Sequence, residues 1–495
     1  MLLLGLDVGT SSIKVSVVES ETQTTIVSVQ YPDTESPITS LKPGWAEQSP
    51  EMWWEHVQLA ILKANATKSY NPQDIEAIGI AYQMHGLVVV DKNQQVLRDS
   101  IIWCDSRAVE IGNRAFDQIG EKQSLSHLLN SPGNFTASKL AWVKENEPAV
   151  YEKIDKIMLP GDFISMKLTS KITTSNSALS EGIFWDFQNN SISEDILNCF
   201  GFDKSLIADV MNVFADHGHL TREMAEKLSL KAGIPVSYKS GDQPNNALSL
   251  NVLNPGEVAA TAGTSGVIYG VSDSITYDKQ SRVNTFAHVN HTGNNTRLGV
   301  LLCINGTGIL NSWTKKNVGS GVDYDVMNNL SASIPVGSDG LKVLPFGNGA
   351  ERMLGNKIIG AHFSNIDFNL HTQSHIFRAV QEGIAFSFRY GLDIMREIGM
   401  NPSVIRAGRA NLFLSKVFTE AFVNVTNVPV ELYENDGSVG AALGAGIGSK
   451  IFSSEKEAFQ NSKPLSLIEP SQAEKYEPIY QDWKLILDKH IKNHN

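Results

Sequence analysis

The stretch GLDVGTSSIKVSVV, residues 5–18, places an aspartate and a run of small polar residues inside a segment that otherwise predicts β-structure. Leucine and valine dominate residues 2–8, which we expect to form a strand. Ile13, Val15 and Val17 then alternate with polar residues, as in a second strand. The stretch therefore predicts a β-hairpin with a tight turn.

The same arrangement recurs in EVAATAGTSGVIYGV, residues 257–271, where Gly-Thr-Ser again separates two apolar runs. Gly9 and Gly263 lie about half of the 495-residue chain apart. One such hairpin would be an ordinary structural element, but two at this spacing indicate an internal repeat. The chain is also too long for one hydrophobic core, so both observations favour two domains of similar build.

Composition excludes several classes of function. A net charge of −12 at pH 7 disfavours binding to nucleic acids or anionic membranes. Cys104, Cys199 and Cys303 are odd in number and lack CxxC spacing, so neither a disulfide framework nor a zinc site is expected. No signal peptide is evident, and no uncharged apolar run reaches the ~18 residues that would span a bilayer. We therefore expect a cytoplasmic protein.

Helical and strand patterns alternate along the chain, which is typical of α/β domains. We expect strands at residues 75–83 and 86–91 and helices at 51–64, 136–154, 375–399 and 438–450. The small residues of 438–450 would let that helix pack tightly against its neighbours. We place the domain boundary between residues 243 and 244 and expect the tail beyond residue 452 to be peripheral.

The two predicted turns favour a phosphate ligand. A tight turn of small residues exposes several backbone N–H groups in one concavity, which attracts phosphate oxygens. Two such turns, one from each half, would hold a triphosphate from both sides of a cleft. The chain has no Gly-Lys dipeptide, and therefore no Walker A loop, and it contains neither HExxH nor GxSxG. A zinc peptidase and an α/β-hydrolase are therefore without support.

Two aspartates are candidates for chemistry. Asp7 lies at a strand end beside the first turn, which suits a carboxylate that holds Mg²⁺ but also one that caps the turn. In SGDQPNNALSL, residues 240–250, Pro244 suits the first turn of a helix and places Asp242 and Gln243 at its N-terminal edge. The helix dipole there predicts that Asp242 is ionised at neutral pH. A catalytic base and a helix cap favour the same place, so the pattern leaves this choice open.

Gln83, Met84 and His85 lie where one predicted strand ends and the next begins. Polar side chains at a strand end are suited to hydrogen-bond a polyol, although a lone histidine is often structural and a methionine often belongs to the core. In IIWCDSRA, Asp105 and Arg107 predict an ion pair that supports a loop.

The chain contains, in this order, GLDVGTSSIKV, GWAEQSPEMWWEHV, GIAYQMHGLVVVD, IIWCDSRA, SGDQPNNAL, AGTSGV and NDGSVGAALGAG. In these motifs it resembles the FGGY carbohydrate kinases over residues 2–450. The resemblance implies two actin-like, ribonuclease-H-type domains with ATP and a sugar in the cleft between them. It also implies ATP-dependent, Mg²⁺-assisted phosphorylation of a ketose, and it is compatible with a homodimer.

The Gln-Met-His-Gly form is most similar to the members that act on D-xylulose, as part of xylose metabolism. Sedoheptulose, ribulose, glycerol or a sugar acid are alternative substrates within this class. Outside it, an actin- or Hsp70-like ATPase that acts as a conformational switch would also explain the two hairpins.

The resemblance further implies roles for individual residues. Asp242 would remove the proton from the sugar hydroxyl, and Asp7 would lie on the Mg²⁺ side. The expected sugar-binding residues are Gln83, Met84, His85, Asp242 and Gln243. The expected nucleotide-binding residues are Gly9, Thr10, Ser11, Ser12, Gly263, Thr264, Gly408 and Asn411.

The chain departs from the family pattern at two places. A Gly-Gly-Gly-Ala loop that cups adenine in the family appears here as Gly408-Arg409-Ala410-Asn411, in which Asn411 would hydrogen-bond the purine. Asn134 replaces a usual glycine before the segment FTASKLAWVKENE.

Overall fold

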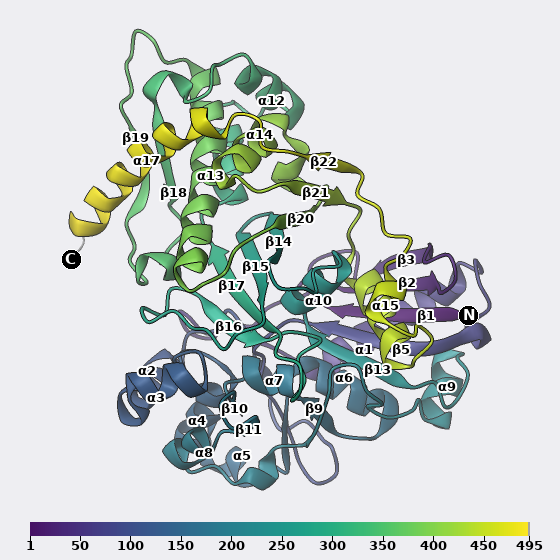
Figure 1. Cartoon of the computed structure of the whole chain (residues 1–495). Coiled ribbons are helices and arrows are strands. Elements are labelled where there is room, and N and C mark those ends of the chain that lie inside the picture. Colours follow the sequence, from purple (N-terminus) through teal and green to yellow (C-terminus); the bar gives the residue numbers. More distant parts are fainter. Residues whose placement is uncertain (494–495) are drawn as a thin grey trace.

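The computed structural model describes residues 1–493 and contains two large mixed β-sheets. The first sheet has the strand order β13 (Val236–Gly241), β5 (Ile75–Tyr82), β1 (Leu2–Val8), β2 (Ile13–Glu19) and β3 (Thr25–Tyr31). The second has the order β16 (Asn284–Ala287), β17 (Leu298–Ile304), β15 (Gly266–Ser272), β14 (Glu257–Ala262), β20 (Val404–Gly408), β21 (Val430–Tyr433) and β22 (Ser466–Ile468). Figure 1 shows the two sheets in the two halves of the molecule.

The five central strands of the second sheet repeat the first sheet. β1 pairs antiparallel with β2 and parallel with β5, and β14 pairs antiparallel with β15 and parallel with β20. β3 and β17 extend the antiparallel sides, while β13 and β21 extend the parallel sides. The two predicted hairpins are therefore equivalent elements of a duplicated α/β unit, as the sequence repeat indicated.

Helices cover both faces of the first sheet, which explains why β1 is almost continuously apolar. α1 (Pro50–Ala66) covers one face, where Trp53, Val57 and Ile61 pack in the same core as Leu4, Leu6 and Val8. α15 (Gly437–Gly448), from the other end of the chain, covers the opposite face (Figure 1).

Glycine on the strands permits this close helix–sheet contact. A Cβ on Gly5 would lie 1.8 Å from Ser438 O, and one on Gly79 would lie 1.9 Å from Ala441 O. The backbone of α15 therefore rests directly on β1 and β5, as its small residues predicted. This contact ties the C-terminal half of the chain to the first sheet.

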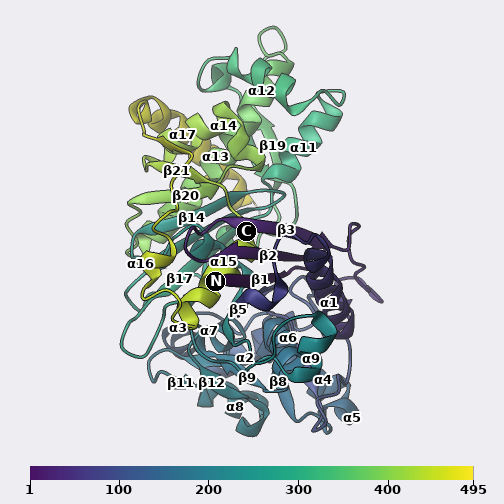
Figure 2. The ribbon, with the colours of Figure 1, turned by 90° about the vertical axis from the view of Figure 1, so that its right-hand side faces the viewer.

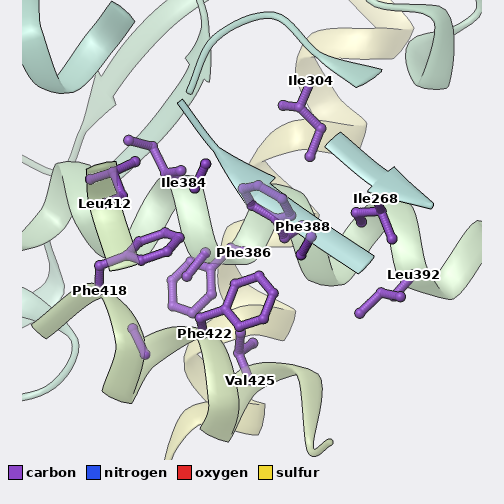
Figure 3. Close-up of a cluster of buried hydrophobic side chains, with 14 of the residues drawn as sticks. Ile268, Ile304, Ile384, Phe386, Phe388, Leu392, Leu412, Phe418, Phe422 and Val425 are labelled. Carbon is purple, nitrogen blue, oxygen red and sulfur yellow. The ribbon is translucent and has the colours of Figure 1, made fainter. Parts of the chain in front are cut away.

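The second sheet packs against α13 (Gln373–Glu397) and α14 (Lys416–Thr426) around a cluster of aromatic side chains. Phe388 and Phe422 meet edge to face with their ring centroids 5.2 Å apart (Figure 3). Burial of each such side chain contributes about 1.5–3 kcal/mol to stability.

The C-terminal helix α17 (Ala473–Asn493) belongs to the same core. Its buried side chains are Tyr476, Tyr480, Trp483 and Leu487. Trp483 Nε1 donates a hydrogen bond to Val343 O at 2.7 Å. The prediction of a peripheral tail is therefore wrong here, because the lysines and glutamates of this segment occupy only the outer face of an amphipathic helix.

A group of shorter helices lies beside the first sheet: α2 (Val109–Ile119), α3 (Glu121–His127), α4 (Thr136–Asn146), α5 (Pro148–Tyr151), α6 (Pro160–Thr169), α7 (Asn176–Glu181) and α8 (Glu194–Phe200). Figure 2 shows α4, α5 and α8 at one end of the molecule and α12 (Tyr324–Ala332), α13 and α14 at the other. The single helix expected at 136–154 is wrong in its length. It breaks at Glu147, because Pro148 starts a new helix at its N-terminal position.

Candidate active site

The turn between β1 and β2 is closed by a hydrogen bond from Gly9 N to Ser12 O at 3.1 Å. Ser11 at its tip is exposed, and Thr10 and Ser12 are half-buried. Thr10 Oγ1 donates to Gln83 Oε1 at 3.1 Å and accepts from Trp103 Nε1 at 3.0 Å. The first turn is therefore held by the strand end that was expected to bind sugar.

Asp7 lies near the end of β1, beside this turn, and its carboxylate faces the first residue of α15. A Cβ on Gly437 would lie 2.5 Å from Asp7 Oδ2, so only glycine leaves room for the carboxylate. Burial raises the pKa of Asp7 to about 6, Lys14 opposes this shift, and Asp436 adds to it. A cation bound nearby would therefore favour the ionised form of Asp7.

Asp242 is the first residue of α10 (Asp242–Ser249) and follows directly on β13. Gly241, not Asp242, occupies the N-cap position. Burial, with the charge of Asp7 as the next cause, raises the pKa of Asp242 to about 7. The expectation of a fully ionised carboxylate at neutral pH is therefore wrong for the ligand-free protein, because desolvation and a like charge outweigh the helix dipole.

Met84 and His85 follow β5, and Met84 lies against Gly241 at the start of α10. Met84 is 5% exposed, and its Cγ would lie 2.6 Å from a Cβ on Gly241. His85 has a left-handed backbone, with φ 63°, and its Nδ1 donates to Glu181 O at 2.9 Å. Nε2 of His85 is therefore left as an acceptor. Burial lowers the pKa of His85 to about 3, so the ring is neutral at physiological pH.

Gln83 is placed differently from its two neighbours. Its side chain is 2% exposed; its Oε1 accepts from Thr10 and its Nε2 donates to Gln48 Oε1 at 3.2 Å. The structure thus places Gln83 beneath the first turn, where it fixes Thr10. A direct contact between Gln83 and a sugar remains a prediction.

A cavity of about 490 Å³ adjoins the second hairpin. Gly263, Thr264 and Asn411, three of the residues predicted to bind the nucleotide, line it together, and nucleotide binding there stays a prediction. Gly308 N, at the start of α11 (Gly308–Asn317), donates to Gly263 O at 2.9 Å and fixes the second turn. Gly408 ends β20 and is not among the residues that line the cavity. Residues 9–12, which form the turn between β1 and β2, do not line it either.

The loop after β7 (Ser100–Ile101) contains the predicted ion pair between Asp105 and Arg107, and it also brings Trp103 to the first turn. Arg107 Nη2 lies 2.7 Å from Asp105 Oδ2, which is the predicted loop-supporting ion pair. Trp103 is 54% exposed and reaches Thr10 of the first turn. In the sequence, Trp103 directly follows Ile101 and Ile102, which are both buried, and this position at the end of an apolar run is the only signal that marks it.

The donor set fits Mg²⁺ in one specific manner. Among residues 1–493 no three His, Cys, Asp or Glu side chains converge as a preformed metal cage. Mg²⁺ prefers one or two carboxylates together with water and substrate phosphates, however, and Asp7 and Asp242 provide such carboxylates.

Within residues 1–493, no helix combines the length and apolar composition needed to cross a membrane.

Comparison with known proteins gives a consistent result. Residues 2–249 match the N-terminal domain of the FGGY family of carbohydrate kinases. The xylulose kinase of Lactococcus lactis subsp. lactis is 28% identical over 98% of this chain and 96% of its own length. That of Bacillus subtilis is 27% identical, with 100% and 98% covered.

Solved structures show the same fold. The ligand-bound xylulose kinase from Lactobacillus acidophilus superposes with a TM-score of 0.90 at 20% identity, covering 100% of this chain and 99% of its own. The gluconate kinase from that organism gives 0.88, also at 20% identity, with 100% and 99% covered. Because one fold is shared by enzymes named for different sugars, it does not by itself select the substrate.

Proposed function

The chain belongs to the FGGY family of carbohydrate kinases, and we propose that it transfers the terminal phosphoryl group of ATP to D-xylulose, giving D-xylulose 5-phosphate. The observation that carries the proposal is the position of Asp242. It begins α10 beside the Met84–His85 strand end, and its pKa responds to Asp7 next to the first phosphate turn. This position supports a role for Asp242 as a base between the sugar side and the phosphate side.

Asp242 accepts the proton of the sugar hydroxyl as that hydroxyl attacks the phosphorus atom. His85 orients the sugar through Nε2, which accepts a hydrogen bond from a hydroxyl. Gly263 and Thr264 bind phosphate oxygens through the second turn, with residues 9–12 on the opposite side. Mg²⁺ bound near Asp7 would neutralise charge on the phosphates. Positioning and charge stabilisation thus provide most of the rate enhancement.

A neutral His85 favours a polyol over a sugar acid. An imidazole with Nε2 as acceptor pairs with a hydroxyl but provides no positive charge for a carboxylate. This supports a ketose rather than an aldonate, even though a gluconate kinase has the same fold.

Three further expectations belong to this proposal. The first domain would comprise residues 1–243 and the second 244–495, with the boundary at the start of α10, between the two sheets. The protein would act in the cytoplasm, and the family resemblance is compatible with a homodimer.

A panel of sugars with coupled ADP detection tests the function. We expect the highest kcat/KM for D-xylulose among D-xylulose, D-ribulose, sedoheptulose, glycerol and D-gluconate. A higher value for another of these sugars would overturn the substrate and leave the kinase intact. ATP hydrolysis that responds to none of them would favour an ATPase switch.

A further inference from the structure

Lys139 is a buried cation that the proposed reaction does not use. It lies on α4, within FTASKLAWVKENE, and its relative exposure is 0%. Burial lowers its pKa to about 7, with Asp105 providing the largest opposing effect. Fully buried lysines are rare unless their N–H groups are hydrogen-bonded. The hydrogen-bond partners of Lys139 therefore indicate what it does in the structure.

Two backbone carbonyls receive the hydrogen bonds of Lys139. Its Nζ donates to His85 O at 2.8 Å and to Ile102 O at 3.0 Å. His85 has the left-handed backbone described above, and Ile102 directly precedes Trp103. Because a neutral amine keeps two N–H donors, both hydrogen bonds can form on either side of pH 7.

The two loops joined by Lys139 carry groups of the proposed site. One loop presents Met84 and the His85 ring, and the other presents Trp103, whose indole donates to Thr10 of the first phosphate turn. The His85 ring is packed between Phe135 and Phe286, with ring-centroid distances of 4.8 and 5.5 Å. The two rings and the hydrogen bond to Glu181 O hold the side chain of His85, whereas Lys139 holds its backbone carbonyl, in addition to the hydrogen bond from Leu87 N to Ile101 O that joins the two loops.

We propose that Lys139 is the positioning residue of the ketose subsite: by binding both carbonyls, it fixes the His85 turn relative to the loop that carries Trp103. This inference rests on the proposed function, because a ketose defines the subsite. Loss of the lysine leaves two buried carbonyls without this donor, so the His85 turn shifts and the sugar is held less well.

The same helix provides a matched control. Lys144 Nζ also donates to two carbonyls, Phe200 O at 2.8 Å and Gly201 O at 2.5 Å. These carbonyls lie at the C-terminal end of α8, where Phe200 is the last helical residue and Gly201 the C-cap, and neither residue is assigned to the sugar or ATP. Lys139→Met and Lys144→Met therefore each remove two lysine-to-carbonyl hydrogen bonds from one helix, although Lys144 is less buried than Lys139, and only the former disturbs the proposed subsite.

The experiment compares kcat and both KM values for the full-length wild type and the two variants. We expect Lys139→Met to raise the KM for D-xylulose about 10- to 100-fold, the scale of a misplaced binding group, with the KM for ATP unchanged. Lys144→Met leaves both KM values unchanged. In thermal unfolding, saturating D-xylulose stabilises the wild type and Lys144→Met more than Lys139→Met.

Lys139→Gln retains N–H donors on a shorter side chain, so we expect an intermediate KM for D-xylulose. This second variant allows the same test if Lys139→Met does not fold. Equal KM values for D-xylulose in the Lys139 and Lys144 variants would overturn the inference and leave the kinase intact. A wild type without ketose-dependent ADP release would instead overturn the proposed function.

Discussion

The charge of Asp7 raises the pKa of Asp242, although the two residues are far apart in the chain. β1 and β13 flank β5 in parallel, with Asp7 level with Ala81 and Gly241 level with Tyr82. Asp7 and Asp242, which follows Gly241, therefore both lie near the carboxyl end of β5. Burial raises both pKa values, to about 6 for Asp7 and about 7 for Asp242. We therefore expect this pair to contribute to the pH dependence of activity.

The first prediction concerns pH dependence of activity. Asp242 must be deprotonated to accept a proton, so kcat/KM should rise with pH and level off above about 7, the pKa of Asp242 in the free enzyme. Asp7→Asn removes the negative charge that raises the pKa of Asp242, so the rise of kcat/KM with pH should begin at lower pH in this variant, although the variant is slower than the wild type. Initial rates across the pH range measure both profiles. A limb that stays in place in the variant would contradict the coupling.

The second prediction concerns stability. An acid whose folded pKa lies above its unfolded value of 3.8 binds more protons when folded, so stability falls as pH rises from about 4 to about 7. Asp242→Asn removes the loss of stability that comes from ionising the buried carboxyl group. The variant should therefore unfold at a higher temperature than the wild type above pH 7, and the difference should vanish below about pH 4. Scanning calorimetry at both extremes checks this, and a variant that is less stable at high pH would disprove it.

The third prediction concerns Mg²⁺ and the first turn. If Asp7 positions the cation, Asp7→Asn should lower turnover by about 10²-fold or more, and excess Mg²⁺ should recover only part of it. Mg²⁺ titrations of kcat provide the measurement. Unchanged turnover at limiting Mg²⁺ would reduce Asp7 to a turn residue.

Gly437→Ala tests the same group without changing its charge. The new Cβ would lie 2.5 Å from Asp7 Oδ2, so the carboxylate must move. We expect a higher Mg²⁺ requirement, as in Asp7→Asn, with folding retained because alanine suits the first turn of α15. A normal Mg²⁺ requirement here would mean that the location of the Asp7 carboxylate is unimportant.

The sequence predicts the fold well where the signal is local or repeated. The two Gly-Thr-Ser hairpins are such a signal, and Pro244 located the start of α10 to within a few residues. The proton affinity of Asp242 was not predictable, because it depends on burial and on Asp7. The hydrogen-bond partners of Lys139 were also not predictable from the sequence, because they are backbone carbonyls that only the folded chain brings to the lysine. Long-range contacts of this kind leave no local pattern.

The fourth prediction concerns the nucleotide. Asn411 lines the cavity beside Gly263 and Thr264, with φ 54°, a conformation that asparagine tolerates. Asn411→Gly removes the amide that would bind the purine without straining the backbone at this positive φ, and it should raise the KM for ATP about 10-fold while leaving the KM for D-xylulose unchanged. Steady-state kinetics with each substrate varied in turn give both values. A change confined to the sugar would place the nucleotide elsewhere.

The last prediction decides between a kinase and a switch, and it rests on Asp242. The sugar hydroxyl must lose its proton as the phosphoryl group arrives, and Asp242 is the carboxylate at the start of α10 beside Met84. Asp242→Asn keeps the size of the side chain, and Gly241 remains the N-cap, so folding should be preserved. Phosphorylation of D-xylulose should fall by about 10²-fold or more, the contribution of a general base.

ATP should still bind to Asp242→Asn, because the residues assigned to its phosphates lie on the two hairpin turns. The experiment measures ketose-dependent ADP release together with ATP affinity for the wild type and the variant. Near-normal phosphorylation in the variant would refute the base. ATP hydrolysis that is equal in both proteins and indifferent to every sugar would favour the switch, since a switch needs the phosphate turns but no acceptor for a sugar proton.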